Sequence, residues 1–423
     1  MVDNKNLKYA VSIIILIAAI TVIAIAVSNH GQSSPQTTSA PTSVPQTSTS
    51  NSTAVYSQLG PIYVNASANG MNATGSSSKP FKTIDQAISF AKPGSIVIVA
   101  PGTYNEDINI TSRVMLEGSY ANTTIINASG KMNGITVNGT AANGTLISNL
   151  TVENADNHGI LVQDANNIQI MHNVVEHNGL SPTLCPQPPA TPTGPCIAED
   201  KPIELVGTSN VTVFDNMVTE NMADGGIGVA DLGFINPGSE AATQIFANAT
   251  DNKIINNFII QNKGGCGIVV ASYNKGVIDN IVENNIVGFG VAGIVIATDT
   301  PNSIALNNVV ENNTAFDNAI PGIIVHSNAP GDALSNTIVR SNMVYGNGAD
   351  KEVGALNGTG IVVSGDVMPV LNTLIENNTV MYEYYGIWLR NANTTILSNN
   401  NVFNNVTVPQ MSNVKQALHS GAI

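Results

Sequence analysis

Charged side chains are scarce in this sequence of 423 residues. Asp, Glu, Lys and Arg together make up 10% of the chain, and 15 basic residues face 29 acidic ones, which gives a formal net charge of −14 at pH 7. An acidic chain is repelled by phosphate backbones, so the composition argues against nucleic acid as a partner. Asn, Ser, Thr and Gly fill the polar positions instead.

Cysteine is also rare, with three residues in the whole chain. Cys185 and Cys196 bracket the centre of a Pro-rich loop that runs from Gly179 to Ala198. If the chain is exported, we expect a disulfide between them. Cys266, in Gly-Cys-Gly-Ile, is predicted to be a small buried residue.

Asparagine, in contrast, is abundant and regularly spaced. An Asn or Asp is followed six residues later by an Asn and five residues after that by another, with Glu383 as the exception at the third position. Where no insertion intervenes, the period is 21 to 24 residues, and a fixed period of this size indicates a solenoid. The nine frames begin at Asn143, Asn167, Asn210, Asp251, Asn274, Asn302, Asn336, Asn372 and Asn393.

A second pattern, Gly-Ile-x-Val or a close variant, accompanies each frame, as at Gly159-Ile160 and Gly267-Ile268. Between the Asn positions apolar and polar residues alternate, which is the period of a strand. A coil of about 22 residues therefore holds about three short strands, which stack in parallel on the next coil and bury one apolar core. The three Asn columns are expected at strand ends, where Asn tolerates a left-handed backbone and stacked amides can hydrogen-bond.

This pattern predicts an all-β fold, a right-handed parallel β-helix of about 10 to 11 coils. Its handedness follows from the preference for right-handed crossovers. We place this domain at residues 59–408, with a C-terminal tail at 409–423.

The N-terminal segment predicts a membrane anchor. Residues Tyr9 to Val27 contain no charge, and as a helix they would span roughly 30 Å. Lys5 and Lys8 precede this run and no charged residue follows it until Lys79, so residues 1–27 are predicted to be a cytoplasmic tip and a single-pass anchor, with the bulk of the chain extracellular. A signal peptide cleaved after Ala24-Ile-Ala26 is the alternative, but the length of the apolar run favours the anchor.

Residues 28–58 are rich in Ser, Thr, Pro and Gln and carry no charge. Such a segment cannot bury a core and is predicted to be an extended stalk. Asn-x-Ser/Thr sequons are dense along the rest of the chain, as at Asn122, Asn312 and Asn377, which indicates a surface glycoprotein. Together these features indicate a eukaryotic or archaeal cell, and the simple anchor and stalk favour an archaeal one.

The repeats are preceded by a predicted cap. Thr83 begins an expected amphipathic helix that reaches Ala91, with Gln86 at the capping-box position. Val97-Ile98-Val99 is the first predicted strand, and Pro101-Gly102-Thr103-Tyr104 forms the turn that leaves it.

This opening resembles the N-terminal cap of the pectate-lyase-like β-helix superfamily, in the branch of surface and secreted proteins with parallel β-helix repeats. The resemblance extends from residue 61 to about residue 405 and implies the fold. That superfamily contains polysaccharide lyases, galacturonases, epimerases, phage tailspikes and non-catalytic surface proteins, so the function has to be argued from the site.

The few charges gather at three adjacent coils. Asp156-Asn157-His158, Glu199-Asp200-Lys201 and Ala223-Asp224-Gly225 precede successive Gly-Ile strands, and Glu204 takes the column position that Leu161 and Gly228 hold in neighbouring coils. Equivalent side chains on neighbouring coils lie about 5 Å apart. The candidate catalytic residues are therefore Asp156, His158, Asp200, Lys201, Glu204 and Asp224.

Two interpretations of this cluster remain open. In a carbohydrate groove, Glu199, Asp200 and Asp224 would bind calcium, or two carboxylates would act as an acid/base pair with His158 or Lys201 transferring protons. Alternatively, these residues are solvated corners of an acidic surface. The Gly179–Ala198 loop and a second insertion, Leu232 to Thr250, interrupt the repeats nearby, either as walls of a groove or as tolerated insertions.

Aromatic residues concentrate in the last full coil. Trp388 shares the column of Glu204, so we expect it to face outward and, with Tyr385, to stack on sugar rings; capping of the final core is the alternative. His172 and His177 are interpreted as structural residues inside a coil or at its corners. A His cluster that binds copper or zinc is the alternative, but no His-x-His or His-x-x-x-His spacing supports it.

The sequence thus predicts a membrane-anchored extracellular β-helix glycoprotein that binds polysaccharide, with lyase or hydrolase activity as an open question. The three arginines, Arg113, Arg340 and Arg390, are far in sequence from the candidate coils, and no galacturonase or lyase motif is evident. The alternative is a non-catalytic structural or adhesive surface protein whose rigid rod is its function.

Overall fold

The computed structural model describes residues 60–180, 201–222, 225–235, 243–392, 394–398 and 400–413. The chain divides into two compact units, residues 1–58 and 59–423. The predicted anchor and stalk lie outside the described residues. Within the described ranges, no helix has the length and apolar character that a membrane crossing requires.

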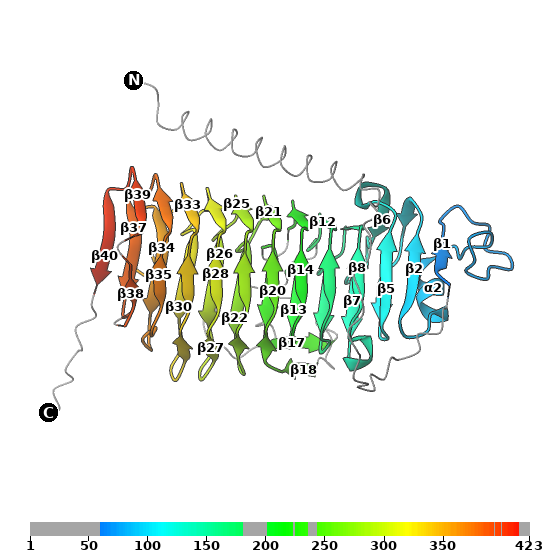
Figure 1. The fold of residues 1–423 in the computed structure, drawn as a ribbon, viewed down its shortest axis with the longest axis horizontal. Coiled ribbons are helices and arrows are strands. Elements are labelled where there is room, and N and C mark those ends of the chain that lie inside the picture. The colour runs from blue at the N-terminus through cyan, green and yellow to red at the C-terminus, as the bar shows by residue number, and fades with distance from the viewer. Residues whose placement is uncertain are drawn as a thin grey trace, which may run out of the picture. The chain divides into compact units, whose positions relative to one another are not determined.

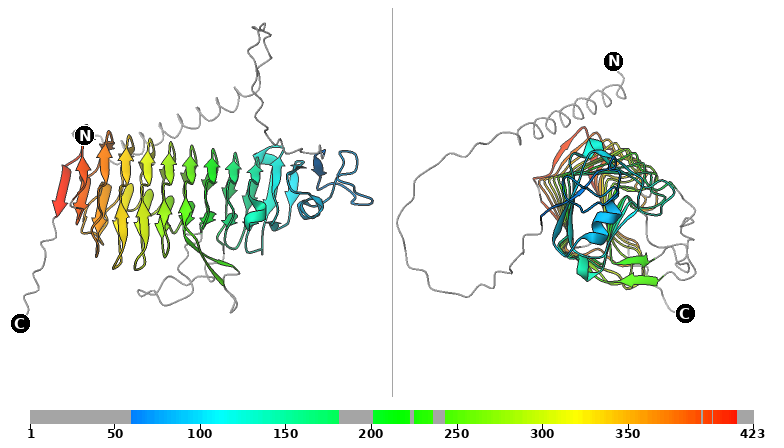
Figure 2. Two further views of the ribbon diagram at one scale, coloured as in Figure 1. Left: turned by 60° about the horizontal axis from the view of Figure 1, so that its bottom comes forward. Right: turned by 90° about the vertical axis from the view of Figure 1, so that its right-hand side faces the viewer.

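The second unit is a right-handed parallel β-helix, as the repeat predicted (Figure 1). Each coil contributes one strand to each of three long parallel sheets, which we name A, B and C in the order in which the chain enters them. The right-hand view of Figure 2 looks along the stack and shows the coils superposed.

Sheet A has twelve strands: β1 (Ile62–Val64), β2 (Ser95–Val99), β5 (Val114–Gly118), β8 (Leu146–Ser148), β11 (Gln169–Met171), β14 (Thr212–Phe214), β20 (Lys253–Ile255), β24 (Ile281–Glu283), β28 (Val309–Glu311), β32 (Ile338–Arg340), β35 (Leu374–Glu376) and β38 (Ile396–Leu397). Sheet B has eleven: β3 (Gly102–Tyr104), β6 (Thr124–Asn127), β9 (Thr151–Glu153), β12 (Val174–Glu176), β15 (Met217–Thr219), β21 (Phe258–Ile260), β25 (Ile286–Gly288), β29 (Thr314–Phe316), β33 (Met343–Tyr345), β36 (Thr379–Met381) and β39 (Val402–Asn404).

Sheet C also has eleven strands: β4 (Ile108–Ile110), β7 (Ile135–Asn138), β10 (Ile160–Gln163), β13 (Ile203–Val206), β16 (Ile227–Ala230), β22 (Ile268–Ser272), β26 (Ile294–Thr298), β30 (Ile323–Ser327), β34 (Thr359–Gly365), β37 (Tyr385–Arg390) and β40 (Val408–Asn413). Nine of them, β7 to β37, are the Gly-Ile strands of the sequence pattern, and β4 and β40 were not part of it. Strand β40 pairs with β37, so sheet C continues past residue 408, where the repeat pattern placed the start of the tail.

Smaller elements lie outside the three long sheets. A fourth parallel sheet contains β19 (Ala249–Thr250), β23 (Val277–Ile278), β27 (Ile304–Leu306) and β31 (Ala333–Ser335). The predicted insertion at Leu232 forms an antiparallel hairpin, β17 (Leu232–Ile235) and β18 (Thr243–Phe246), which projects from the stack (Figure 2). Two 3₁₀ turns, η1 (Ala121–Thr123) and η2 (Thr140–Ala142), lie near the N-terminal end.

The predicted cap is the short helix α2 (Ile84–Phe90). The Thr83 side chain accepts a hydrogen bond from the Gln86 backbone N–H, as an N-cap residue does. The carboxylate of Glu106 accepts two more, from the N–H groups of Ile84 and Asp85. Ile84 and Ala87 are fully buried, so this helix covers apolar side chains at the end of the core.

Ladders of buried Asn hold the corners together. In the longest, which starts at Asn173 and ends at Asn401, each side-chain N–H₂ donates to the next Asn carbonyl oxygen over 3.0 or 3.1 Å. A second ladder includes Asn178, Asn221 and Asn262, and Glu383 takes the place of Asn at its far end by accepting from Asn347. The predicted amide columns are therefore present.

The structure separates two roles that the sequence pattern combined. The first residue of a frame, such as Asn210 (φ 53°), has the left-handed backbone and is exposed. The second and third residues, such as Asn216 and Asn221, are buried and form the ladders. Both kinds of Asn link neighbouring coils, since Asn210 also donates to Asn167 over 2.7 Å, but in these frames the left-handed turn falls to the exposed residue.

Four of the nine frames were assigned in the wrong register. The frames that begin at Asn274 and Asn302 are shifted by one corner, because Asn285 and Asn313, their third positions, lie in the ladder that the second positions form elsewhere. At the two ends of the array, Leu150 and Asn401 occupy that same column, so the frames at Asn143 and Asn393 are shifted by one and two residues. Successive corners lie five residues apart, so a five-residue spacing alone cannot distinguish them.

The first prediction concerns this ladder. Asn257 accepts from the backbone and side-chain N–H groups of Asn216 and donates to Asn285 and to the Val213 carbonyl. Asn257→Ala leaves these buried groups unsatisfied, so we expect it to destabilise the protein by about 2–4 kcal/mol in chemical denaturation. Asn274→Ala, at an exposed position in the next coil, is the control and should change stability by less than about 0.5 kcal/mol; equal effects would show that the ladder adds no stability.

Candidate functional site

The described residues contain part of the predicted charge cluster. Glu199, Asp200 and Asp224, the candidate calcium ligands, lie outside the described residues, as do Cys185 and Cys196. Asp156 is half-buried, and its backbone N–H donates to Lys131. Lys201 and Glu204 lie together on the outer side of sheet C.

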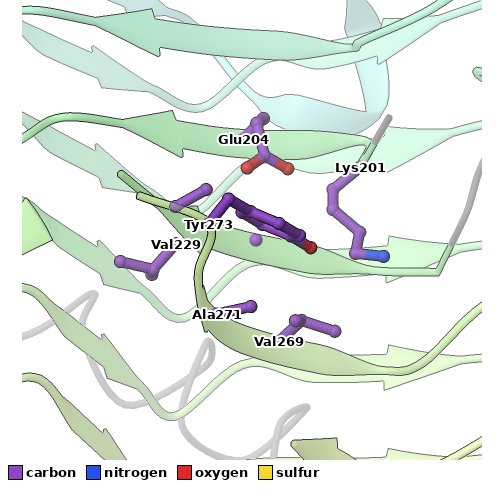
Figure 3. Close-up of a pocket in the computed structure, with 8 residues that line it drawn as sticks. Lys201, Glu204, Val229, Val269, Ala271 and Tyr273 are labelled. Atoms are coloured by element: carbon purple, nitrogen blue, oxygen red, sulfur yellow. The ribbon is translucent and has the colours of Figure 1, made fainter. Parts of the chain in front are cut away.

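A small pocket on the outer side of sheet C brings Lys201, Glu204 and Tyr273 together (Figure 3). Lys201 precedes β13, Glu204 lies within it, and Tyr273 follows β22. All three are buried, with Lys201 only 1% exposed. The pocket is lined by Lys201, Glu204, Gly228, Val229, Ala230, Val269, Ala271 and Tyr273.

The column that contains Glu204 was predicted correctly. Leu161, Glu204 and Gly228 are in register across β10, β13 and β16. A Cβ atom on Gly228 would lie 2.1 Å from a Glu204 carboxylate oxygen. The absence of a side chain at residue 228 therefore creates the space that the Glu204 carboxylate occupies.

Asp231 positions Tyr273. Its fully buried carboxylate accepts hydrogen bonds from the Ser272 hydroxyl at 2.6 Å and from the backbone N–H groups of Tyr273, Asn274 and Lys275 at 2.7, 3.2 and 2.6 Å. These four donors fix the turn that follows β22. Asp231 is therefore a structural residue of the pocket wall.

His158, predicted as a proton-transfer candidate, is 6% exposed. Its Nδ1 lies 2.7 Å from the Lys201 carbonyl oxygen, and because a carbonyl only accepts, Nδ1 is the donor. The imidazole therefore fixes the backbone that carries Lys201, which is a positioning role.

A carboxylate–imidazole pair that was not predicted from the sequence lies next to the pocket. Asp299 follows β26, and its carboxylate lies 3.9 Å from Nε2 of His326 in β30, with the two side chains 24% and 25% exposed. Asn328 donates to Asp299 at 2.7 Å. Burial raises the pKa of the Asp299 carboxyl above its usual value, and the nearby charge of Asp332 raises it further. His326, the hydrogen bond from Asn328 and the charge of Lys201 lower this pKa, but by less than burial raises it.

A second pair continues the same edge of sheet C. Arg390 Nη1 lies 3.0 Å from an Asp366 carboxylate oxygen and donates to the Glu352 carbonyl. His326, Ser364 and Arg390 are in register on successive strands. We name Asp299, His326, Asp366 and Arg390 the sheet C edge. In the sequence, His326 and Arg390 lie three residues after the Ile that opens their Gly-Ile strand, and this recurring polar position is the signal. The prediction considered mainly the charges that precede these strands.

Trp388 does not present an open face. It lies on the outer side of sheet C, in the column of Val362, but it is 3% exposed and belongs to an apolar cluster with Val353 and Ala355. The half-buried Tyr385 meets it edge-on, with ring centroids 4.7 Å apart. The prediction that Trp388 lies on the outer side was correct. The sequence analysis did not predict the segment with Val353 and Ala355 that packs against it. Cys266 is half-buried and packs against the same apolar cluster.

The fold and the residue pattern define this chain as a pectate-lyase-like right-handed parallel β-helix protein. Residues 67–232 match a family described as "Protein of unknown function (DUF1565)", and residues 243–416 match one described as "Periplasmic copper-binding protein (NosD)". No curated protein sequence matches the chain.

Solved structures share the fold at low sequence identity. The A-module of mannuronan C-5 epimerase AlgE4 from Azotobacter vinelandii is 16% identical, with a TM-score of 0.51 over 84% of this chain and 100% of that one. Pectate lyase Pel9A is 14% identical, with a TM-score of 0.52 over 84% and 79%. The family 28 exopolygalacturonase of Yersinia enterocolitica is 14% identical, with a TM-score of 0.52 over 84% and 78%.

The second prediction tests the buried acid. Because burial raises the pKa of folded Asp299, the unfolded carboxyl ionises first as pH rises, and the native state loses stability above the ordinary pKa of 3.8. Asp299→Asn keeps an acceptor for Asn328 and cannot ionise, so its denaturation midpoint should rise relative to the parent at pH 7 and the difference should shrink towards pH 3.

Asp279→Asn is the matched control, because exposed Asp279 also accepts from an Asn side chain, that of Asn307. Its denaturation midpoint should follow that of the parent at every pH. An Asp299→Asn midpoint that does not change relative to the parent between pH 3 and pH 7 would contradict a raised pKa.

Proposed function

We propose that this protein binds polysaccharide outside the cytoplasm and that the sheet C edge is the contact surface. The observation that carries the proposal is the concentration of paired charges at this edge, in a chain of which only 10% is charged. Asp366 has the Arg390 guanidinium and Asp299 has the His326 imidazole within 4 Å. Side chains that are fixed in this way can donate to and accept from sugar hydroxyl groups.

The accessible and buried groups have different roles in this proposal. The side chains of Asp299, His326, Asp366 and Arg390 are between 24% and 35% exposed, so a ligand reaches them. Lys201, Glu204 and Tyr273 are buried, so they are not contact residues in this proposal. The charge of Lys201 acts on Asp299, which links the buried pocket to the accessible surface.

The comparisons support the class of ligand. The epimerase, lyase and exopolygalacturonase that share the fold are named for mannuronan, pectate and polygalacturonan. The NosD family is described as periplasmic, which fits an exported chain. Whether the sugar is cleaved as well as bound is an outcome of the experiment below.

We also propose that residues 9–27 anchor the protein in the membrane, that residues 28–58 form a stalk, and that the β-helix is glycosylated outside the cell. The support is the uncharged apolar run, the Ser/Thr/Pro-rich composition and the sequons. Several sequon Asn residues lie exposed at corners, including Asn122, Asn312, Asn377 and Asn405. An oligosaccharide transferase requires such accessibility.

The third prediction tests the contact surface. Full-length protein in detergent is screened on a glycan array, and the affinity for the best ligand is measured for the parent and for Arg390→Gln. Loss of hydrogen bonds from a charged group costs about 1.5–3 kcal/mol, so Arg390→Gln should weaken binding roughly 10- to 150-fold. Reducing-end and 235 nm absorbance assays on the same ligand report hydrolysis or elimination.

Arg340→Gln is the matched control, because Arg340 also pairs with a carboxylate, that of Glu311, but on the outer side of sheet A. It should bind like the parent. Equal losses in both variants, or no glycan bound by the parent, would contradict the proposed surface and favour a structural rod.

The fourth prediction tests the anchor. Deletion of residues 9–27 should move the protein from the membrane fraction to the soluble fraction after expression, because this run supplies the apolar length that a bilayer requires. Protein that stays in the membrane pellet and resists extraction with salt and alkali would show that another segment holds it there.

A further inference from the structure

A group of metal-ligating side chains lies on the outer side of sheet B, away from the sheet C edge. Glu153 and Glu176 end strands β9 and β12 and are direct register partners. His177 follows Glu176 at the corner. One ligand atom from each of these three residues lies within 4.8 Å of the other two. Two ligands of one tetrahedral zinc ion lie about 3.4 Å apart, since each bond is about 2.1 Å long. Side-chain rotations that bring the ligand atoms closer by up to about 1.4 Å would therefore complete the site.

The next coil adds a fourth group. The carboxylate of Glu220 lies 3.1 Å from Nε2 of His177. Glu153, Glu176 with His177, and Glu220 belong to three successive coils. Because the group is assembled across coils, no His-x-His or His-x-x-x-His spacing reveals it in the sequence.

Unbalanced charge at this position favours a cation. Like charges directly opposite each other on neighbouring strands are destabilising, and Glu153 and Glu176 are such a pair. Glu220 adds a third carboxylate, hydrogen-bonded to His177 from the next coil. Three carboxylates therefore surround a single imidazole. Further along the same column, the register partner of Glu176 is the uncharged Thr219, so the conflict is confined to these coils.

A neighbouring corner serves as an internal comparison. His172 lies in the same coil, with the same left-handed backbone (φ 57° against 55° for His177) and similar exposure (44% and 48%). It also has an acidic neighbour, Asp215 at 3.5 Å. The residue before it is Met171, whose register partners are Ser148 and Phe214. His172 thus has one carboxylate beside it, whereas His177 has three.

We propose that Glu153, Glu176 and His177 bind a divalent first-row transition ion such as Zn²⁺, with Glu220 as a fourth ligand or as the acceptor for the imidazole. Imidazole nitrogen with carboxylate oxygen is a zinc donor set, whereas calcium takes oxygen ligands. The ion links three coils on the outer side of sheet B, neutralises the carboxylates and stabilises this part of the array.

The experiment uses chelator-treated full-length protein in detergent and Zn²⁺ as the probe. Isothermal titration should show one ion that is lost or weakened at least about tenfold in His177→Gln and in Glu176→Gln. Gln261 occupies the equivalent corner two coils further on with φ 56°, so Gln at residue 177 is compatible with the backbone. Zinc should also raise the thermal midpoint of the parent but not that of His177→Gln.

His172→Gln is the matched control and should bind zinc like the parent. Three results would overturn the proposal: no zinc uptake by the parent, uptake that His177→Gln leaves unchanged, or equal losses in His172→Gln and His177→Gln. The last two would mean that the ion binds elsewhere or only to the general acidic surface. Because the site lies on sheet B, none of these results depends on whether the sheet C edge binds glycan.

Discussion

The hydrogen bond between successive buried Asn side chains is the interaction on which the rest of the molecule depends. Each interior Asn of a ladder both donates to and accepts from its neighbours, so Asn recurs at the same corner of successive coils. Exceptions include Leu150 and Glu383 at ladder ends and Gly290, which donates only its backbone N–H to the next Asn. A missing member leaves buried polar groups on both sides unsatisfied, which costs more than the bond itself contributes. The ladders therefore fix the register of every strand, and the apolar columns inside the coils follow that register.

The outer faces of the sheets are free of this constraint. Outward residues are stacked about one strand spacing apart, yet their chemistry changes from coil to coil. The column of Glu204 includes Leu161, Gly228 and Trp388, and that of Glu176 continues to Phe316 and Tyr345. A rigid ladder combined with variable outer columns allows unlike sites to lie on one scaffold without disturbing its core.

Sequence reasoning reached the fold because the fold is periodic. The frames and the Gly-Ile strands predicted the three-strand coil, and the capping residue Thr83 predicted helix α2. The register of single frames failed where two successive corners have the same five-residue spacing. The candidate site was predicted in part: Lys201 and Glu204 lie together as expected. Asp299 and His326 were missed because the prediction considered mainly charges before the Gly-Ile strands, whereas His326 lies near the end of β30 and Asp299 follows β26. The burial of Trp388 involves Val353 and Ala355, which lie in a non-repeating segment and have no sequence signal.

The scarcity of charge makes its arrangement informative. At the sheet C edge, Asp366 lies beside the guanidinium of Arg390 and Asp299 beside the imidazole of His326, so each carboxylate there has a nitrogen-bearing partner of its own. On sheet B, Glu153, Glu176 and Glu220 share one imidazole, which leaves negative charge to be neutralised. Both arrangements occur on the same repeat, so the difference lies in the choice of outer residues. It is this local charge balance, rather than the fold, that separates a surface suited to sugars from one suited to a metal ion.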